Sequence, residues 1–130
     1  RDAGFRLYEA AGIGRDDAAG RVRQTLENFR MFGAPHVAII SSDAALGPYG
    51  AVDCGGYVAN FLLAAEAAGV ATIRQAGLAH HAGFVRTHFG LGDDRRVVCG
   101  ISFGYADPDH PANAVRTPRA TVEEAVTLLG

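Results

Sequence analysis

The chain has 130 residues, of which 48% are hydrophobic and 20% are charged, and its formal net charge is −2. These values predict a globular chain with enough apolar residues for one hydrophobic core. The near-neutral charge argues against a nucleic-acid-binding surface, so no nucleic-acid partner is expected.

Compartment and membrane association follow from a few residues. Cys54 and Cys99 lie far apart and form no Cys-x-x-Cys motif, so a reducing, cytoplasmic compartment is expected. Asp53, Asn60 and Glu66 interrupt the longest apolar segment. That segment therefore predicts a buried helix of a soluble protein, and no membrane partner is expected.

The first third of the chain predicts two helices and a strand. A helix is expected from Asp2 to Ala11, and a second from Asp17 to Met31, with Asp16 as its N-cap. His36 to Ile40 is short, apolar and rich in β-branched residues. It is predicted to be a buried central strand.

The middle of the chain predicts one long helix from Gly50 to Ala68. Its residues are apolar or small nearly all round, which is typical of a helix buried on every side. Gly55 and Gly56 would admit a neighbouring backbone. Asp53 and Asn60 share one face, so they are expected to be buried polar groups that bond across an interface.

A short strand and a turn should follow this helix. Gly69 is expected to end the helix in a left-handed conformation, before a strand from Val70 to Ile73. The pattern of strand, helix and strand places both strands in one sheet. Arg74 to Leu78 is predicted as a turn, with helical segments at Leu78–His81 and Ala82–Phe89.

The clearest strand is predicted from Val97 to Tyr105. Its odd positions are bulky and its even positions, among them Gly100, Ser102 and Gly104, are mostly small. The long helix is expected to pack on the small face. Beyond it, Asp107 to Arg119 reads as an extended arm.

The arm leads to a last helix. Thr121 and Glu124 have the spacing of a capping box at its start. Its apolar face is expected to comprise Val122, Ala125, Val126 and Leu129.

Several other possible sites are disfavoured by their context. His80, His81 and His88 lack a cysteine or carboxylate at metal-ligand spacing, so they are predicted to be surface residues and no metal is expected.

The segment Ser41–Asp43 has no surrounding nucleophile motif, so a nucleophile site is not expected there. Tyr49 and Phe89 could line a substrate pocket, but core packing is preferred. Asp107 and Asp109 resemble a paired-carboxylate site, but a turn is the preferred interpretation.

Four segments together resemble the FMN-dependent nitroreductase family, in its nitrobenzoate-reductase-like branch. They are collinear and cover nearly the whole chain: NFRMFGAP at 28–35, YGAVDCGGYVANFLLAAEAAGVAT at 49–72, QAGLAHHAGFVRTHFGL at 75–91 and VVCGISFGYADPDHPANAVRTPR at 97–119. The resemblance implies an α+β fold, an α/β/α sandwich, and an intertwined homodimer with the long helix at its centre. Members carry a further N-terminal half that nothing here matches. Residues 1–130 are thus expected to be the C-terminal portion of a single, incomplete nitroreductase-like domain.

The same resemblance implies a site for FMN. The turn Arg74–Gly77 would approach the N5 edge of the flavin, which gives cofactor-binding roles to Gln75, Ala76 and Gly77. Relatives often have proline where this chain has Arg74. Arg116 and Arg119, just before the last helix, would hold the FMN phosphate, since arginine forks suit phosphate oxygens.

The implied activity is transfer of reducing equivalents from NAD(P)H through FMN to a nitroaromatic or quinone acceptor. The flavin would supply the chemistry, so no side chain is expected to be a catalytic acid or base. The alternative is a non-catalytic, dimerising fragment that lacks a complete flavin pocket.

Overall fold

The computed structural model describes residues 2–129. By its internal contacts the chain divides into two compact units. One unit is Arg23–Ala106, and the other combines the segments up to Val22 and from Asp107. The mixture of helices and an antiparallel sheet confirms the α+β prediction.

The larger unit is built on a three-stranded sheet. Its strands are β1 (His36–Asp43), β2 (Ala71–Gln75) and β3 (Arg95–Gly104), in the order β1-β3-β2. Both outer strands run antiparallel to β3, so β1 and β2 are parallel to each other. The prediction that both belong to one sheet is confirmed.

The predicted central position of the strand at His36–Ile40 is wrong. Within the described residues β1 lies at an edge of the sheet, and β3 separates it from β2. The physical reason is that a run of apolar residues reports burial and not pairing order. Only β3 pairs on both sides, and its Ile101 is fully buried.

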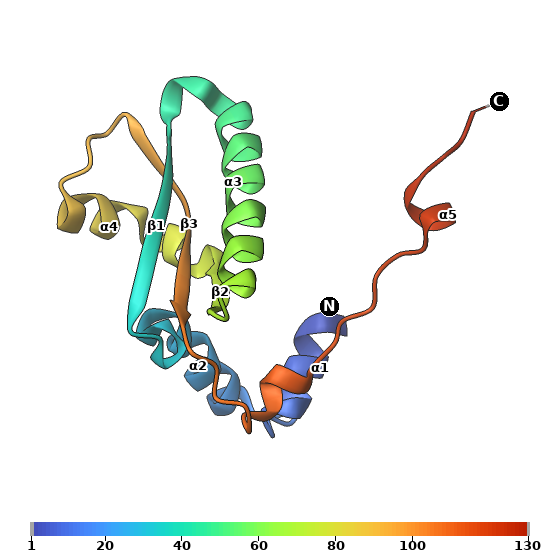
Figure 1. Cartoon of the computed structure of the whole chain (residues 1–130). Helices are drawn as coiled ribbons and strands as arrows, with labels where there is room; N and C mark the ends of the chain where they lie inside the picture. The colour runs from blue at the N-terminus through green and yellow to red at the C-terminus, as the bar shows by residue number, and fades with distance from the viewer. Residues whose placement is uncertain (1, 130) are drawn as a thin grey trace. The chain divides into compact units, whose positions relative to one another are not determined.

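Helix α3 (Gly47–Ala67) connects β1 to β2 and covers one face of the sheet (Figure 1). The core there consists of Ile40, Val58 and Ile101, with Phe61 and Leu62 of α3 packed against it. The helix therefore packs on the bulky face of β3, and the prediction that it covers the small face is wrong. Large side chains are needed to fill the space between a helix and a sheet.

The small face of β3 is covered by η3 (Ala76–His81) and α4 (Ala82–Phe89), on the side of the sheet opposite α3 (Figure 1). A Cβ atom added at Gly100 would overlap Cδ1 of the buried Leu78. Glycine is thus required because Leu78 approaches the strand backbone closely. Helix α4 has the predicted bounds, whereas η3 begins two residues before the predicted Leu78.

Much of α3 is exposed, so the prediction of a helix buried on all sides is wrong for the chain by itself. Only Gly50 and Val58 of the helix are buried, whereas Val52 is 68% exposed and Leu63 is 70% exposed. Asp53 and Asn60 are also exposed. An apolar sequence cannot reveal whether its partner lies in the same chain.

Within residues 2–129, no helix has the length and apolar character needed to cross a membrane.

The pairing of β1 with β3 contains a bulge. Ile40 pairs with Cys99, but the next residue, Ser41, pairs with Val97. Val98 is therefore an extra residue in β3, and the simple alternation of bulky and small positions holds only from Cys99 onward.

The segment before β1 departs from the single predicted helix. The α-helix α2 (Ala18–Leu26) gives way to a 3₁₀ segment, η1 (Glu27–Gly33). Met31 and Phe32 have φ angles of 56° and 52°, which cost about 1–2 kcal/mol each for residues with a Cβ atom. At the start of α2, the backbone N–H of Gly20 donates to Asp17, so Asp17 replaces the predicted cap Asp16.

The smaller unit is made of the N-terminal and C-terminal segments of the chain. Helix α1 (Asp2–Ala10), close to its predicted span, contacts η4 (Pro111–Ala114). The predicted capping box begins α5 (Val122–Ala125). The predicted continuation of this helix toward Leu129 is wrong, because Val126 is extended.

Two short features flank α3. The helical turn η2 (Ala44–Leu46) is capped by Asp43. Gly69 is left-handed, with φ of 73°, as predicted.

Candidate functional site

The turn after β2 begins later than the sequence predicted. Strand β2 includes Arg74 and Gln75, and the turn starts at Ala76, the first residue of η3. Successive strand residues face opposite sides of the sheet. Accordingly Arg74 is exposed, whereas Gln75 is only 2% exposed.

The side chain of Gln75 points into the protein. Its Nε2 atom donates a hydrogen bond of 2.7 Å to the backbone carbonyl of Asn28, and its Oε1 atom accepts one from the hydroxyl of Ser102. Asn28 lies in η1 and Ser102 in β3, where it is 1% exposed. Any contact of residue 75 with a ligand would therefore come from its backbone.

Ala76 and Gly77 form the outer part of the turn. No side chain caps η3, and the first N–H groups of a helix have no partner within it. Ala76 is exposed and carries only a methyl group. This backbone can therefore offer hydrogen-bond donors to an acceptor with little obstruction by side chains.

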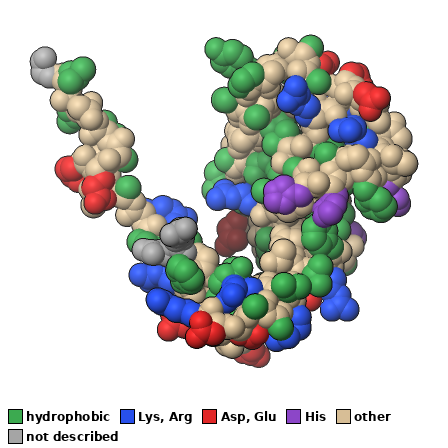
Figure 2. Space-filling model, turned by 180° about the vertical axis from the view of Figure 1, so that it is seen from behind, with side chains coloured by type: hydrophobic (Ala, Val, Ile, Leu, Met, Phe, Trp, Pro, Cys, Tyr) green, Lys and Arg blue, Asp and Glu red, His purple; other side chains and the backbone are tan. Residues whose placement is uncertain are grey.

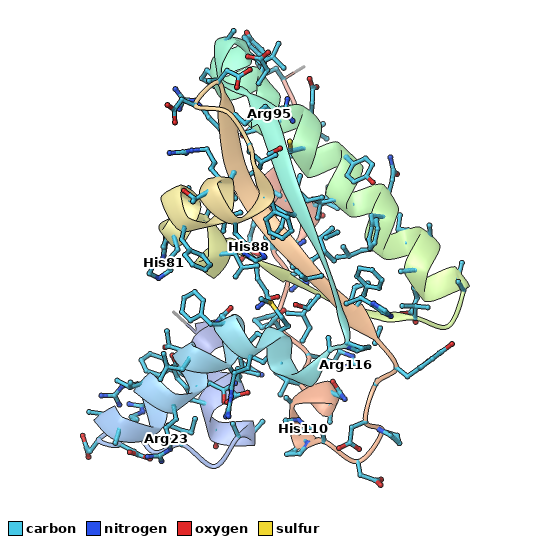
Figure 3. All side chains as sticks on the ribbon, turned by 90° about the vertical axis from the view of Figure 1, so that its left-hand side faces the viewer. Arg23, His81, His88, Arg95, His110 and Arg116 are labelled. Atoms are coloured by element: carbon cyan, nitrogen blue, oxygen red, sulfur yellow. The ribbon has the colours of Figure 1, made fainter. Side chains whose placement is uncertain are left out.

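Arg116 and Arg119 lie on the arm of the smaller unit, and both are exposed (Arg116 is labelled in Figure 3). Arg116 donates from one terminal nitrogen to the carbonyls of Asn113 and Val115. Arg119 donates from one to the carbonyls of Thr117 and Pro118. Each guanidinium has further N–H donors, so each can also donate to a phosphate oxygen.

Charge near β2 is set by few groups. Gln75, Ala76 and Gly77 carry no titratable side chain. On the other face of the sheet, burial raises the pKa of the Cys99 thiol and nearby Cys54 raises it further, while Arg74 acts in the opposite direction. Any polar contact of Gln75, Ala76 or Gly77 with a ligand would therefore come from backbone groups and not from an ionisable side chain.

An apolar cavity of about 560 Å³ lies on the η3 and α4 side of the sheet. Apolar side chains form most of its wall, mainly Phe29, Val37, Ile39, Phe84, Val85 and Phe89. His81 and His88 also line it, and Figure 3 shows both on this side of the sheet. A cavity of this size and lining is typical of sites for small organic molecules.

The histidines of this region have aromatic neighbours. The ring of His81 meets Phe29 edge-on at 5.0 Å between centroids, and His88 stacks on Phe84 at 6.0 Å. Histidines also lie beside hydrophobic side chains on the face shown in Figure 2. His81 and His88 are exposed, as predicted, but they belong to this aromatic wall.

Two other predictions concern aromatic residues and turns. Phe89 lines the cavity and is 52% exposed, and Tyr49 is 78% exposed, so core packing is wrong for both. In the arm, Asp107 accepts a hydrogen bond from the backbone of Asp109, which confirms the turn.

Residues 2–129 contain no group of three or more His, Cys, Asp or Glu side chains placed to hold a metal ion. The segment Ser41–Asp43 has structural contacts instead. Ser41 bonds Arg95, Ser42 packs against Gly50, and Asp43 caps η2.

Sequence reasoning missed Asn28 and Ser102. Each residue nevertheless has a signal in the sequence. Ser102 is one of the small residues at the even positions of β3, and Asn28 begins the first segment that resembles the nitroreductases. Neither signal indicated that both would meet Gln75, because the contacts span 47 and 27 residues of sequence.

Known proteins are similar to this chain in sequence and in structure. The nitroreductase NfnB of Mycolicibacterium smegmatis is 41% identical over 123 residues, which is 95% of this chain and 52% of the relative. A 4-nitrobenzoate reductase of Pseudomonas putida is 32% identical over 124 residues, or 95% of this chain and 55% of that protein. The chain thus spans about half the length of these relatives.

The structural comparison agrees. The crystal structure of an FMN-dependent nitroreductase NfnB from Mycobacterium smegmatis in complex with NADPH superposes with a TM-score of 0.92 at 39% identity, and it is matched over 99% of this chain and 58% of that one. A profile described as "Nitroreductase family" matches residues 6–105. The chain therefore belongs to the nitroreductase family.

Proposed function

We propose that this chain is part of an FMN-dependent oxidoreductase that passes reducing equivalents from NAD(P)H to a nitroaromatic or quinone acceptor. The observation that carries the proposal is the 41% identity with nitroreductase NfnB. The NfnB crystal structure with NADPH is described as that of an FMN-dependent enzyme. Other relatives are a 4-nitrobenzoate reductase and a nitrobenzene nitroreductase, which supports an aromatic nitro compound as the acceptor.

The residues present fit FMN. No side chain caps the turn, Ala76 is exposed and Gly77 is half-buried, which suits the polar edge of a flavin ring. Arg116 and Arg119 are exposed cations with donors to spare, which suits a phosphate. In this proposal the turn would bind the ring and the arginines would bind the phosphate.

FMN, when bound, would carry the electrons between donor and acceptor. The protein would bind and orient it. Backbone N–H groups of the turn are fixed dipoles, which can stabilise negative charge on a bound ring without reorganising. No ionisable side chain of the turn takes part, in keeping with Gln75, Ala76 and Gly77 being the residues there.

We also propose a homodimer formed through α3. Its outer face exposes large apolar residues, among them Val52, Tyr57 and Leu63. Beside them, Gly55 and Gly56 have nothing within 4 Å of a Cβ added at either position. A second copy would cover this face, since apolar patches of this kind mark interaction sites.

A specific observation favours the alternative of a dimerising fragment without a complete flavin pocket. The chain spans only 52% of the M. smegmatis relative, so it contains only part of what that protein contains. In this alternative α3 still mediates dimerisation, but the arginines and the turn bind nothing.

FMN titration of the 130-residue chain, followed by flavin fluorescence, separates these possibilities. The expected result is saturable binding that Arg119→Ala weakens about tenfold, since a phosphate contact is lost. Arg96→Ala, which removes an exposed arginine of β3, is the matched control and should bind as the parent chain does.

Sizing chromatography of the same samples tests the dimer. A chain that elutes as a dimer but leaves FMN fluorescence unchanged would support the fragment and contradict the oxidoreductase. If, with oxygen excluded, the loaded chain oxidises more than one equivalent of NADPH only when 4-nitrobenzoate is present, the proposed acceptor class is supported.

A further inference from the structure

The residue before the turn, Gln75, has an amide that is almost fully buried, at 2% exposure. A buried amide is costly unless its donors and acceptor are satisfied by hydrogen bonds. Within the described residues, no buried side-chain nitrogen or oxygen lacks a hydrogen-bond partner. The site around Gln75 is thus built to hold an amide.

The partners fix the orientation of this amide. A backbone carbonyl can only accept hydrogen bonds, so the contact of 2.7 Å with the carbonyl of Asn28 must be made by Nε2. The hydroxyl of Ser102 then donates to Oε1. If the Gln75 amide turned over, Oε1 would face the carbonyl of Asn28 and that bond would be lost, because both oxygens only accept. The Asn28 carbonyl therefore fixes the orientation of the amide, which links β2, β3 and η1.

The same residues touch the turn itself. A Cβ atom added at Gly77 would lie 3.4 Å from the side chain of Asn28. The Nε2 atom of Gln75 also lies 3.5 Å from Oδ1 of Asn28. Asn28 therefore supports the turn from its inner side, next to the point where Gln75 fastens its beginning.

We propose that Ser102 and Asn28 are positioning residues that act through Gln75 to hold the Ala76–Gly77 backbone in its flavin-binding conformation. This inference rests on the proposed function. An apolar side chain at residue 75 could fill the same volume, but it could not fix one orientation through directional bonds. Buried networks that are fully satisfied make a local structure rigid and unique.

A double-mutant design separates positioning from stability. Gln75→Leu and Ser102→Ala each leave a buried polar group without its partner, so each should lower the urea midpoint of the chain. The double variant Gln75→Leu/Ser102→Ala removes the donor and acceptor of the Ser102–Gln75 bond together, so its midpoint should lie above that of Gln75→Leu. The carbonyl of Asn28 lacks its partner in both of these variants.

The first readout needs no cofactor. In a 3₁₀ helix the amides of residues 79–81 bond to the carbonyls of residues 76–78, so their exchange reports on the order of the turn. Hydrogen exchange of the 130-residue chain should become about tenfold faster at the amides of 79–81 in both Gln75→Leu and the double variant, which corresponds to about 1.4 kcal/mol of lost protection. Exchange in α3 should not change in the double variant. Unchanged exchange at 79–81 in the double variant would overturn the proposal.

The second readout is FMN affinity. If the network positions the turn, the double variant should bind FMN about tenfold more weakly than the parent chain although it is more stable than Gln75→Leu, and the midpoint potential of the bound flavin should shift. If the network matters for stability alone, affinity and potential return to parent values in the double variant, and the proposal fails.

The matched control is Ser41→Ala. Ser41 is also a strand serine with a hydrogen-bonded hydroxyl, which accepts from Arg95 at 2.9 Å, but it lies in β1 away from the turn. It should change neither the exchange of 79–81 nor FMN affinity. A parent chain that binds no FMN would overturn the proposed function, whereas the exchange measurement still decides whether the network orders the turn.

Discussion

The two faces of the sheet differ in the kind of contact that holds them. On the α3 face, Ile40, Val58 and Ile101 form an apolar core. On the opposite face, a polar network of Gln75, Ser102 and Asn28 lies near an apolar cavity. The same strand, β3, contributes alternate residues to both.

This difference separates stability from local conformation. Apolar burial is nondirectional and contributes most of the folding free energy. Hydrogen bonds contribute little net free energy each, but they select one arrangement of the groups that make them. The α3 face should therefore determine whether the larger unit folds, and the opposite face should determine how the turn after β2 is presented.

The largest expected effect comes from the α3 face. Ile101 is 0% exposed, and Ile101→Ala should lower the free energy of unfolding by about 2–5 kcal/mol because it leaves a cavity in the core. Urea unfolding followed by circular dichroism measures this. Ile73→Ala, at a 43% exposed position of β2, is the control and should cost clearly less. Equal costs at the two positions would contradict the assignment of the core.

A smaller effect is expected on the opposite face. Gly100→Ala would force Leu78 to move, and overpacking of this kind costs about 1–3 kcal/mol. Gly83→Ala in α4 has open space around it and should stabilise the chain by about 0.5–1 kcal/mol, since alanine favours a helix. The two alanine variants should thus shift the urea midpoint in opposite directions. Shifts of the same sign would show that Leu78 does not press on β3.

The smallest expected effect concerns Cys99, between α3 and β3. Because burial raises its pKa, Cys99 should react with iodoacetamide several-fold more slowly in the native chain than in urea. As the pH rises past the ordinary thiol pKa, the unfolded chain ionises first, so this thiol makes stability fall with increasing pH. Mass spectrometry of the alkylated peptide gives the rate. Equal rates in native and unfolded chains would mean that water reaches this face freely.

Several elements could be predicted from the sequence because their signals are local. Helix α4, the left-handed Gly69 and the capping box of α5 all depend on neighbours within a few residues. The fold class also followed, since residues 28–119 resemble one family. The turn was predicted to begin at Arg74, two residues before its observed start at Ala76. The sequence could not reveal this boundary, because Gln75 continues the pairing of β2 with Gly100 of β3.

The tertiary structure alone decided the rest. The sequence determined that β3 has a bulky face and a small face and that α3 is apolar nearly all round. It did not determine that β3 lies between β1 and β2, that α3 takes the bulky face, or that Gln75 meets Ser102 and Asn28. Hydrophobicity and spacing describe what each segment can bury, whereas pairing order and the partners of a buried amide depend on segments that are distant in sequence and meet only in the folded chain.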